Sequence, residues 1–161
     1  MVEWTEVNVV DDLIIRLVAT KLGLQMLQFP PFQAPAGERN DANRWMNQAA
    51  NELLAYFAGN LRVFTVPLDM QGTDFQLRVW NQLLKIPYGE TRSYAQVAEA
   101  IGRPKAVRAV GAANGSNPVA IVVPCHRVIG SSGKLTGYGG GLPLKKRLLE
   151  LEGAWTMGLK M

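Results

Sequence analysis

The chain has 161 residues, of which 48% are hydrophobic and 19% are charged with both signs present. This composition excludes a disordered chain and is sufficient for one ordinary domain or two small ones. No apolar run is long enough to span a bilayer, and the N-terminus lacks the basic and apolar regions of a signal peptide. The single cysteine cannot form an intramolecular disulfide, so we expect a cytoplasmic protein that does not associate with membranes.

Positive charge is concentrated in the second half of the chain. The net charge is +4, but 12 of the 17 basic residues and only 5 of the 13 acidic residues lie from Gln71 onward, which gives that part a net charge of +7. Such a distribution permits a polyanionic partner in this half, although charge alone does not identify one.

The sequence of residues 1–70 predicts a small α+β scaffold domain without a catalytic constellation. Two β-prone segments, 13–20 and 24–29, flank Leu22-Gly23 and predict a hairpin. Apolar residues recur at helical spacing over 42–59, and Gly59 is placed to end that helix. A further short strand is expected over 61–68.

The sequence of residues 71–161 predicts a mostly helical second domain, so the fold class expected for the whole chain is α+β. Capping boxes at Thr73 and Ser93 are expected to open helices over 75–86 and 94–102. Pro104 is typical of the first position of a third helix, over 104–114.

The helices predicted over 94–102 and 104–114 match the proportions of a helix-turn-helix motif. A glycine-containing turn joins them, and small residues on the second helix would let it enter a DNA groove. An αα-hairpin packed in a core, whose alanines permit close contact, is the alternative.

The stretch "VVPCHRVIGSSG" at 122–133 contains the only cysteine and the only histidine of the chain. One Cys and one His cannot build a zinc site without several carboxylates, so no metal is expected. A thiolate nucleophile would need His126 as its base. Because neighbouring side chains of a strand point to opposite faces, a turn or a bridging water is then required. Residue types alone leave open whether Cys125 is a nucleophile or a buried structural residue beside a surface histidine.

The motif "PCHRVIG", with "RPKAVRAVGAANGSNP" before it and "SSGKLTGYGGG" and "LLELEG" after it, resembles the active-site segment of the O6-alkylguanine-DNA alkyltransferases, the methylated-DNA–protein-cysteine methyltransferases. The resemblance runs from about Thr73 to Gly153. It implies a DNA repair protein that binds double-stranded DNA containing O6-alkylguanine through the minor groove, flips out the damaged nucleotide and transfers the alkyl group once to its own cysteine. A monomer without cofactors is implied, and activity on O4-alkylthymine stays open.

The resemblance also implies roles for particular residues. Cys125 would accept the alkyl group, His126 would act through a bridging water, and Glu152 would orient the histidine. Asn117 would brace the relay, and Tyr94 would help to rotate the nucleotide and donate to the departing base. The expected DNA-contacting residues are Tyr94, Lys105, Arg108, Ala109 and Arg127, with Arg108 filling the space of the extruded base. The expected pocket residues are Pro124, Val128, Gly137, Tyr138 and Gly139, and the backbone of Val128 would accept a hydrogen bond from guanine.

Other functions compete with this interpretation. A helix-turn-helix regulator, or an alkylguanine-binding protein that transfers nothing, would bind DNA without losing the alkyl group from it. A cysteine hydrolase would turn over many times.

Family members that bind zinc in the N-terminal half use Cys and His ligands there, and residues 1–70 of this chain contain neither Cys nor His.

Overall fold

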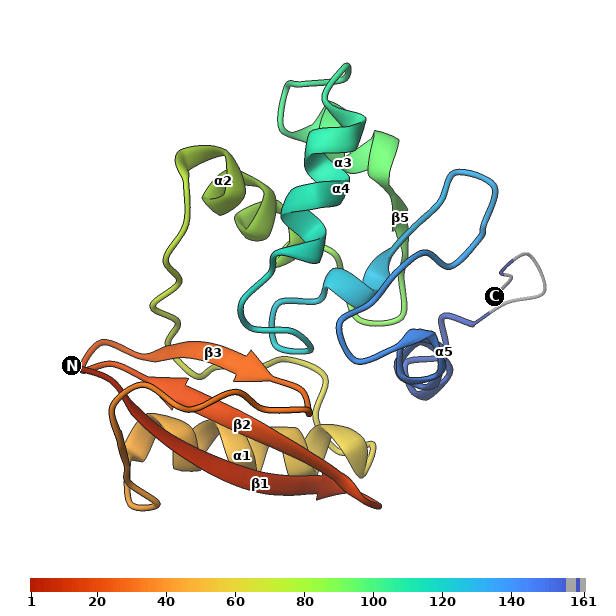
Figure 1. The fold of residues 1–161 in the computed structure, drawn as a ribbon. Coiled ribbons are helices and arrows are strands. Elements are labelled where there is room, and N and C mark those ends of the chain that lie inside the picture. The colour runs from red at the N-terminus through yellow and green to blue at the C-terminus, as the bar shows by residue number, and fades with distance from the viewer. Residues whose placement is uncertain (156–158, 160–161) are drawn as a thin grey trace. The chain divides into compact units, whose positions relative to one another are not determined.

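The chain forms two compact units, Met1–Gln71 and Gly72–Met161, in the computed structural model (Figure 1). The structure describes residues 1–155 and 159. No helix in the described part of the chain combines the length and apolar character needed to cross a bilayer.

The first unit is a four-stranded sheet with one helix across a face (Figure 1). The strand order is β3-β2-β1-β4, with β1 (Glu3–Val10), β2 (Leu13–Ala19), β3 (Leu24–Gln28) and β4 (Glu38–Arg39). Strands β1, β2 and β3 form an antiparallel meander, and β4 pairs in parallel with β1. Helix α1 (Arg44–Phe57) buries Met46, Ala49, Leu53 and Tyr56, which recur at the spacing of one helix face.

Two of the expectations for this unit are confirmed and one is wrong. The β2–β3 hairpin is present, and Gly59 follows α1 with a φ of +80°, the left-handed conformation that glycine adopts without strain. The strand expected over 61–68 reduces to one isolated bridge between Leu24 and Leu68. The carboxylate of Glu52 accepts the backbone N–H groups of Thr65 and Val66, so these donors do not join a strand ladder. Strand β1 was not anticipated.

The second unit is mostly helical. It contains α2 (Asp74–Leu83), α3 (Tyr94–Ala100), α4 (Val107–Gly115) and α5 (Leu142–Leu151), together with a parallel pair of two-residue strands, β5 (Arg92–Ser93) and β6 (Val128–Ile129). The α+β fold class is confirmed. Both capping boxes, at Thr73 and Ser93, are present.

Helix α4 begins later than the sequence suggested. Its first residue is Val107, whereas Pro104 lies in a turn that the backbone of Ala106 closes by donating to the carbonyl of Arg103. The expected start at Pro104 is therefore wrong by three residues, because a turn satisfies the backbone groups that the first helical turn would have used. The indole N–H of Trp80 on α2 donates to the carbonyl of Ala113 at 2.8 Å and fixes the end of α4 that leads towards the site.

Candidate active site

A single turn of 3-10 helix, η1 (Cys125–Arg127), carries the lone cysteine and the lone histidine between Pro124 and strand β6. The turn removes the alternation that a strand would impose on neighbouring side chains. Both side chains are buried: His126 has no exposed surface and Cys125 is 6% exposed. Of the two possibilities that the sequence left open, a turn or a bridging water, the structure contains the turn.

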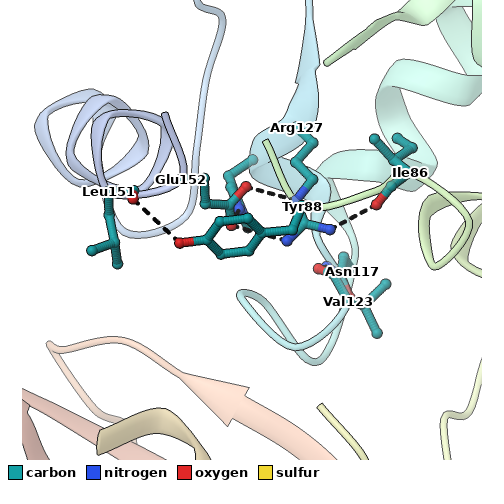
Figure 2. A network of polar contacts seen from close by, with 8 residues as sticks. Ile86, Tyr88, Asn117, Val123, Arg127, Leu151 and Glu152 are labelled. Atoms are coloured by element: carbon teal, nitrogen blue, oxygen red, sulfur yellow. Dashed lines mark hydrogen bonds and ion pairs between the residues drawn. The ribbon is translucent and has the colours of Figure 1, made fainter. Parts of the chain in front are cut away.

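The carboxylate of Glu152, just after α5, joins His126 to Arg127. His126 Nε2 lies 2.8 Å from Glu152 Oε2, while Arg127 donates through Nε to Oε1 at 2.8 Å and through Nη2 to Oε2 at 3.0 Å. A third nitrogen of Arg127 donates to the carbonyl of Ile86 at 2.7 Å. Figure 2 shows Glu152 joined to Arg127, which also reaches Ile86, with Tyr88 donating to the carbonyl of Leu151 beside them.

This arrangement fixes the state of the histidine ring. A carboxylate paired with Arg127 is an acceptor, so Nε2 of His126 carries the hydrogen and Nδ1 keeps a lone pair. Nδ1 is buried and has no hydrogen-bond partner among the described residues. Burial lowers the pKa of His126, and the hydrogen bond and charge of Glu152 oppose that shift. The ring is therefore a neutral base with a free acceptor nitrogen.

The cysteine lies in an environment that keeps it as a thiol. Burial raises the pKa of Cys125, and the side chain of Asn117 and the charge of Lys145 act in the opposite direction. Asn117 also donates to the carbonyl of Val123 at 2.8 Å and accepts from the backbone of Val119 at 3.0 Å, which fixes the segment before Pro124. Deprotonation of this thiol therefore requires an adjacent base.

Lys145 on α5 is a buried residue that sequence reasoning did not identify. It has no exposed surface, and its ammonium donates to the carbonyls of Val128 at 2.7 Å and Thr136 at 3.3 Å. Burial lowers its pKa to about 8, and attraction to Cys125 acts against the shift. In "LPLKKRLLEL" it looks like one of three surface cations, and only the helical spacing that places it between Leu142 and Leu148–Leu149 would have indicated burial.

A pocket of about 500 Å³ lies between α4 and the glycine-rich loop, residues 137–141. The residues that line it are Tyr94, Val107, Gly111, Asn114, Gly115, Thr136, Gly137, Tyr138 and Gly139. Tyr94 is held by a hydrogen bond between its hydroxyl and that of Thr136. The volume is in the range of small-molecule sites. Two of the α4 residues that line the pocket, Gly111 and Gly115, have no side chain, so α4 occupies little of the space there.

The structure brings together some of the expected pocket residues and separates others. Gly137, Tyr138 and Gly139 line the pocket, whereas Pro124 and Val128 are not among its lining residues. The carbonyl of Val128 accepts from Lys145, which leaves one of its two lone pairs for another donor. Asn114, which was not singled out, connects the pocket to the nucleophile by donating to the carbonyl of Cys125 at 3.4 Å.

The expected DNA-contacting residues divide into two groups. Lys105, Arg108 and Ala109 are exposed at the start of α4, and no hydrogen bond or ion pair of Arg108 occurs within the described residues. Arg127, in contrast, is only 7% exposed and is engaged by Glu152 and Ile86. Its guanidinium faces the interior, and this placement does not favour the DNA contact expected of it.

No group of three or more His, Cys, Asp or Glu side chains suited to a metal ion occurs in the part of the chain that the structure describes.

Comparison with known proteins gives consistent matches. Residues 74–154 match the family model described as 6-O-methylguanine DNA methyltransferase, DNA binding domain. The chain is 68% identical over 104 residues to the methylated-DNA–protein-cysteine methyltransferase of Mycobacterium bovis, a match that covers 65% of this chain and 63% of that protein. It is 49% identical over 142 residues to the protein of the same name from Methanosarcina barkeri, covering 86% of this chain and 89% of the other.

A solved structure is similar over almost the whole chain. The crystal structure of Mycobacterium tuberculosis OGT in complex with DNA matches with a TM-score of 0.86 and 48% identity, and the match covers 94% of this chain and 92% of that one.

Proposed function

The chain belongs to the 6-O-methylguanine DNA methyltransferase family, and from this premise we propose that it repairs DNA by transferring the alkyl group of O6-alkylguanine to Cys125. The observation that carries the proposal is the buried thiol beside a neutral histidine whose ring is oriented by a carboxylate. This is the arrangement that activates a cysteine nucleophile.

The first chemical event is the removal of the thiol proton. His126 Nδ1 is the acceptor, directly or through one water, and Glu152 stabilises the imidazolium that forms. The Arg127 fork keeps Glu152 ionised, so the positive ring appears next to a carboxylate already in place. The positive charge of Lys145 also favours the Cys125 thiolate.

The second event is the attack of the thiolate on the alkyl carbon. A carbon–sulfur bond forms as the carbon–oxygen bond to O6 breaks, and the electron pair stays on guanine, which takes up a proton. We assign the donation of that proton to the hydroxyl of Tyr94, which lines the pocket. The thioether that results has no leaving group that a residue of this site can displace, so each chain reacts once and needs no cofactor.

Access to the base requires extrusion from the duplex, which costs a few kcal/mol. Helices α3 and α4 have the proportions of a helix-turn-helix. The exposed side of α4 carries Arg108, Ala109 and Ala112, and the exposed Lys105 lies in the turn just before it. We propose that this slim helix enters the minor groove, where sequence discrimination is poor, and that Arg108 occupies the space left by the base. One chain supplies every residue of the relay, so we propose a monomer, acting in the cytoplasm where a lone thiol stays reduced.

Intact mass after reaction tests the proposal. With excess O6-methylguanine DNA, the mass of the chain should rise by one methyl group, located on Cys125, and Cys125→Ser should bind the same DNA without gaining mass. Repeated turnover would indicate a hydrolase, and binding without any gain in mass would indicate a regulator or a non-transferring binding protein.

The role of Arg108 is tested separately. Arg108→Ala should slow transfer from duplex DNA at least tenfold more than transfer from free O6-alkylguanine base, which needs no extrusion. Lys105→Ala should weaken DNA binding uniformly and lower its salt dependence by about one phosphate contact. Equal losses on duplex and free base would show that Arg108 contributes charge alone.

A further inference from the structure

Asn114 occupies a position that the chemistry described so far does not explain. It lies near the end of α4, is 5% exposed, and lines the pocket between α4 and the glycine-rich loop. Its Nδ2 donates to the carbonyl of Cys125 at 3.4 Å. The amide therefore bridges the residue that holds the nucleophile and the space in which a base would lie.

The orientation of the amide follows from this contact. The group facing the Cys125 carbonyl must be the donor, because two oxygens at that distance would repel each other. Oδ1 then faces away from that carbonyl, and it is buried with no hydrogen-bond partner among the described residues. The backbone on either side is fixed, since the carbonyl of Ala113 accepts from Trp80 at 2.8 Å and the side chain of Ser116 donates to the carbonyl of Ala112 at 2.8 Å.

A buried acceptor without a donor is costly, and it becomes useful when a ligand provides the donor. O6-Alkylguanine joined to its sugar has one group with N–H donors, the exocyclic 2-amino group. O4-Alkylthymine has no N–H donor at all, because its ring nitrogens carry the sugar or act as acceptors. Cys125 does not itself line the pocket, but the lining residue Asn114 is hydrogen-bonded to its carbonyl. A base in the pocket that brings its alkyl group to Cys125 would therefore lie beside the Asn114 amide.

We propose that Asn114 Oδ1 accepts a hydrogen bond from the 2-amino group of the flipped base and thereby selects alkylated guanine over alkylated bases without an amino group. The inference rests on the proposed function, since it assigns the base specificity of the same site. Asn114 is a specificity-determining residue in this scheme, because its oxygen meets the base but takes no part in the transfer of the alkyl group.

The test compares single-turnover transfer from two DNA duplexes that differ by one group, O6-methylguanine and O6-methylhypoxanthine, which lacks the 2-amino group. A site with a buried acceptor discriminates against the substrate that leaves it unpaired, so the wild-type protein should react at least about tenfold faster with O6-methylguanine. Asn114→Leu, similar in volume but apolar, should reduce the ratio of the two rates by about tenfold, and Asn114→Ala should do the same. O4-Methylthymine should behave as O6-methylhypoxanthine does.

The matched control is Ser116→Ala, which removes a side-chain hydrogen bond at the same end of α4 and should keep the wild-type ratio. A wild-type ratio near one overturns the inference, as does a ratio that survives in both Asn114 variants or that also collapses in Ser116→Ala. Absence of any transfer from O6-methylguanine by the wild-type protein would instead refute the proposed function.

Discussion

Two buried arginines, one in each unit, pair with glutamates in almost the same geometry but in different surroundings. In the first unit, Arg16 donates through Nε and Nη2 to Glu6 at 3.0 and 2.7 Å. In the second unit, Arg127 donates through the same two nitrogens to Glu152 at 2.8 and 3.0 Å. Both arginines are 7% exposed, and each uses its remaining nitrogen on a backbone carbonyl.

The difference lies in what else the carboxylate serves. The side chain of Glu6 is 27% exposed, and Arg16 is enclosed by the rings of Trp4 and Phe32, at 4.9 and 4.6 Å from their centroids. The side chain of Glu152 is fully buried and also accepts from His126. A buried ion pair by itself is therefore weak evidence of a functional site, and the third, titratable partner distinguishes the second pair.

The largest difference between the two pairs is expected when the charge of the glutamate is removed. Glu152→Gln leaves Arg127 buried without a counter-ion, which should cost about 3–5 kcal/mol of unfolding free energy and slow transfer by about 100-fold or more because the imidazolium loses its partner. Glu6→Gln should cost about 1 kcal/mol and leave the transfer rate unchanged. Chemical denaturation and single-turnover kinetics measure both.

Combining Glu152→Gln with a second change, at His126, tests whether the relay acts as a unit. His126→Gln combined with Glu152→Gln should transfer little more slowly than the more damaging single variant, because both changes remove one function. Rates that fall by the product of the two single effects would contradict the relay.

A second contrast concerns buried cations. Among the residues that the structure describes, the ammonium of Lys145 has only carbonyl partners, whereas Arg16 has a carboxylate. Lys145→Met should slow transfer at pH 7 by about tenfold, or about 1.4 kcal/mol, because the charge that favours the Cys125 thiolate is lost. The pKa of Lys145 is lowered to about 8, so the wild-type protein loses the same charge above that pH. The two rates should converge by pH 9.5, and a constant ratio across that range would exclude the charge effect.

The acid stability of the second unit should depend on His126. Burial lowers the pKa of His126, so below its unfolded value of about 6.5 the unfolded chain binds a proton that the folded chain does not. The contribution of His126 to the free energy of unfolding is therefore fully present above pH 6.5. It is lost as the pH falls below that value, by up to about 1.4 kcal/mol per pH unit. His126→Gln should remove this component from the pH dependence of unfolding, and an unchanged slope between pH 6.5 and 5 would contradict the prediction.

The parts of the fold that were predictable are those fixed by local chemistry. The capping boxes at Thr73 and Ser93 and the glycine after α1 depend on hydrogen bonds or backbone angles within a few residues. The strand expected over 61–68 failed because the competing acceptor, Glu52, is distant in sequence. The sequence around 61–68 contains no sign that a carboxylate from another element accepts its backbone N–H groups.

The candidate site shows the same division. The adjacency of a nucleophile and a base indicated that either a turn or a bridging water was needed, and the structure contains a turn at Cys125–Arg127. The environment of Arg127 was not predictable, because a basic residue in a basic half of the chain indicates a surface position. For Lys145 the only sequence signal of burial was its helical spacing between Leu142 and Leu148–Leu149. The roles of these residues are proposals that the variants above test.

The smallest effect expected concerns the aromatic rings beside the two arginines. Phe32→Leu removes one of the two rings that enclose Arg16 and should cost about 0.5–1 kcal/mol of stability beyond the lost packing, with no change in transfer. Tyr88 lies farther from its arginine, with its centroid 5.8 Å from Arg127 Cζ, and its hydroxyl donates to the carbonyl of Leu151 at 3.2 Å. Because Leu151 precedes Glu152, this hydrogen bond fixes the backbone that positions the carboxylate.

Tyr88→Phe keeps the ring and removes only that hydrogen bond, so it should cost about 1 kcal/mol and slow transfer by about two- to threefold through looser placement of Glu152. Thermal unfolding and single-turnover rates at a temperature where both proteins are folded separate the two effects. If Tyr88→Phe lowers stability but leaves the transfer rate unchanged, Tyr88 has only a structural role in the second unit, as Phe32 has in the first. The residues that affect transfer would then extend no further than Arg127.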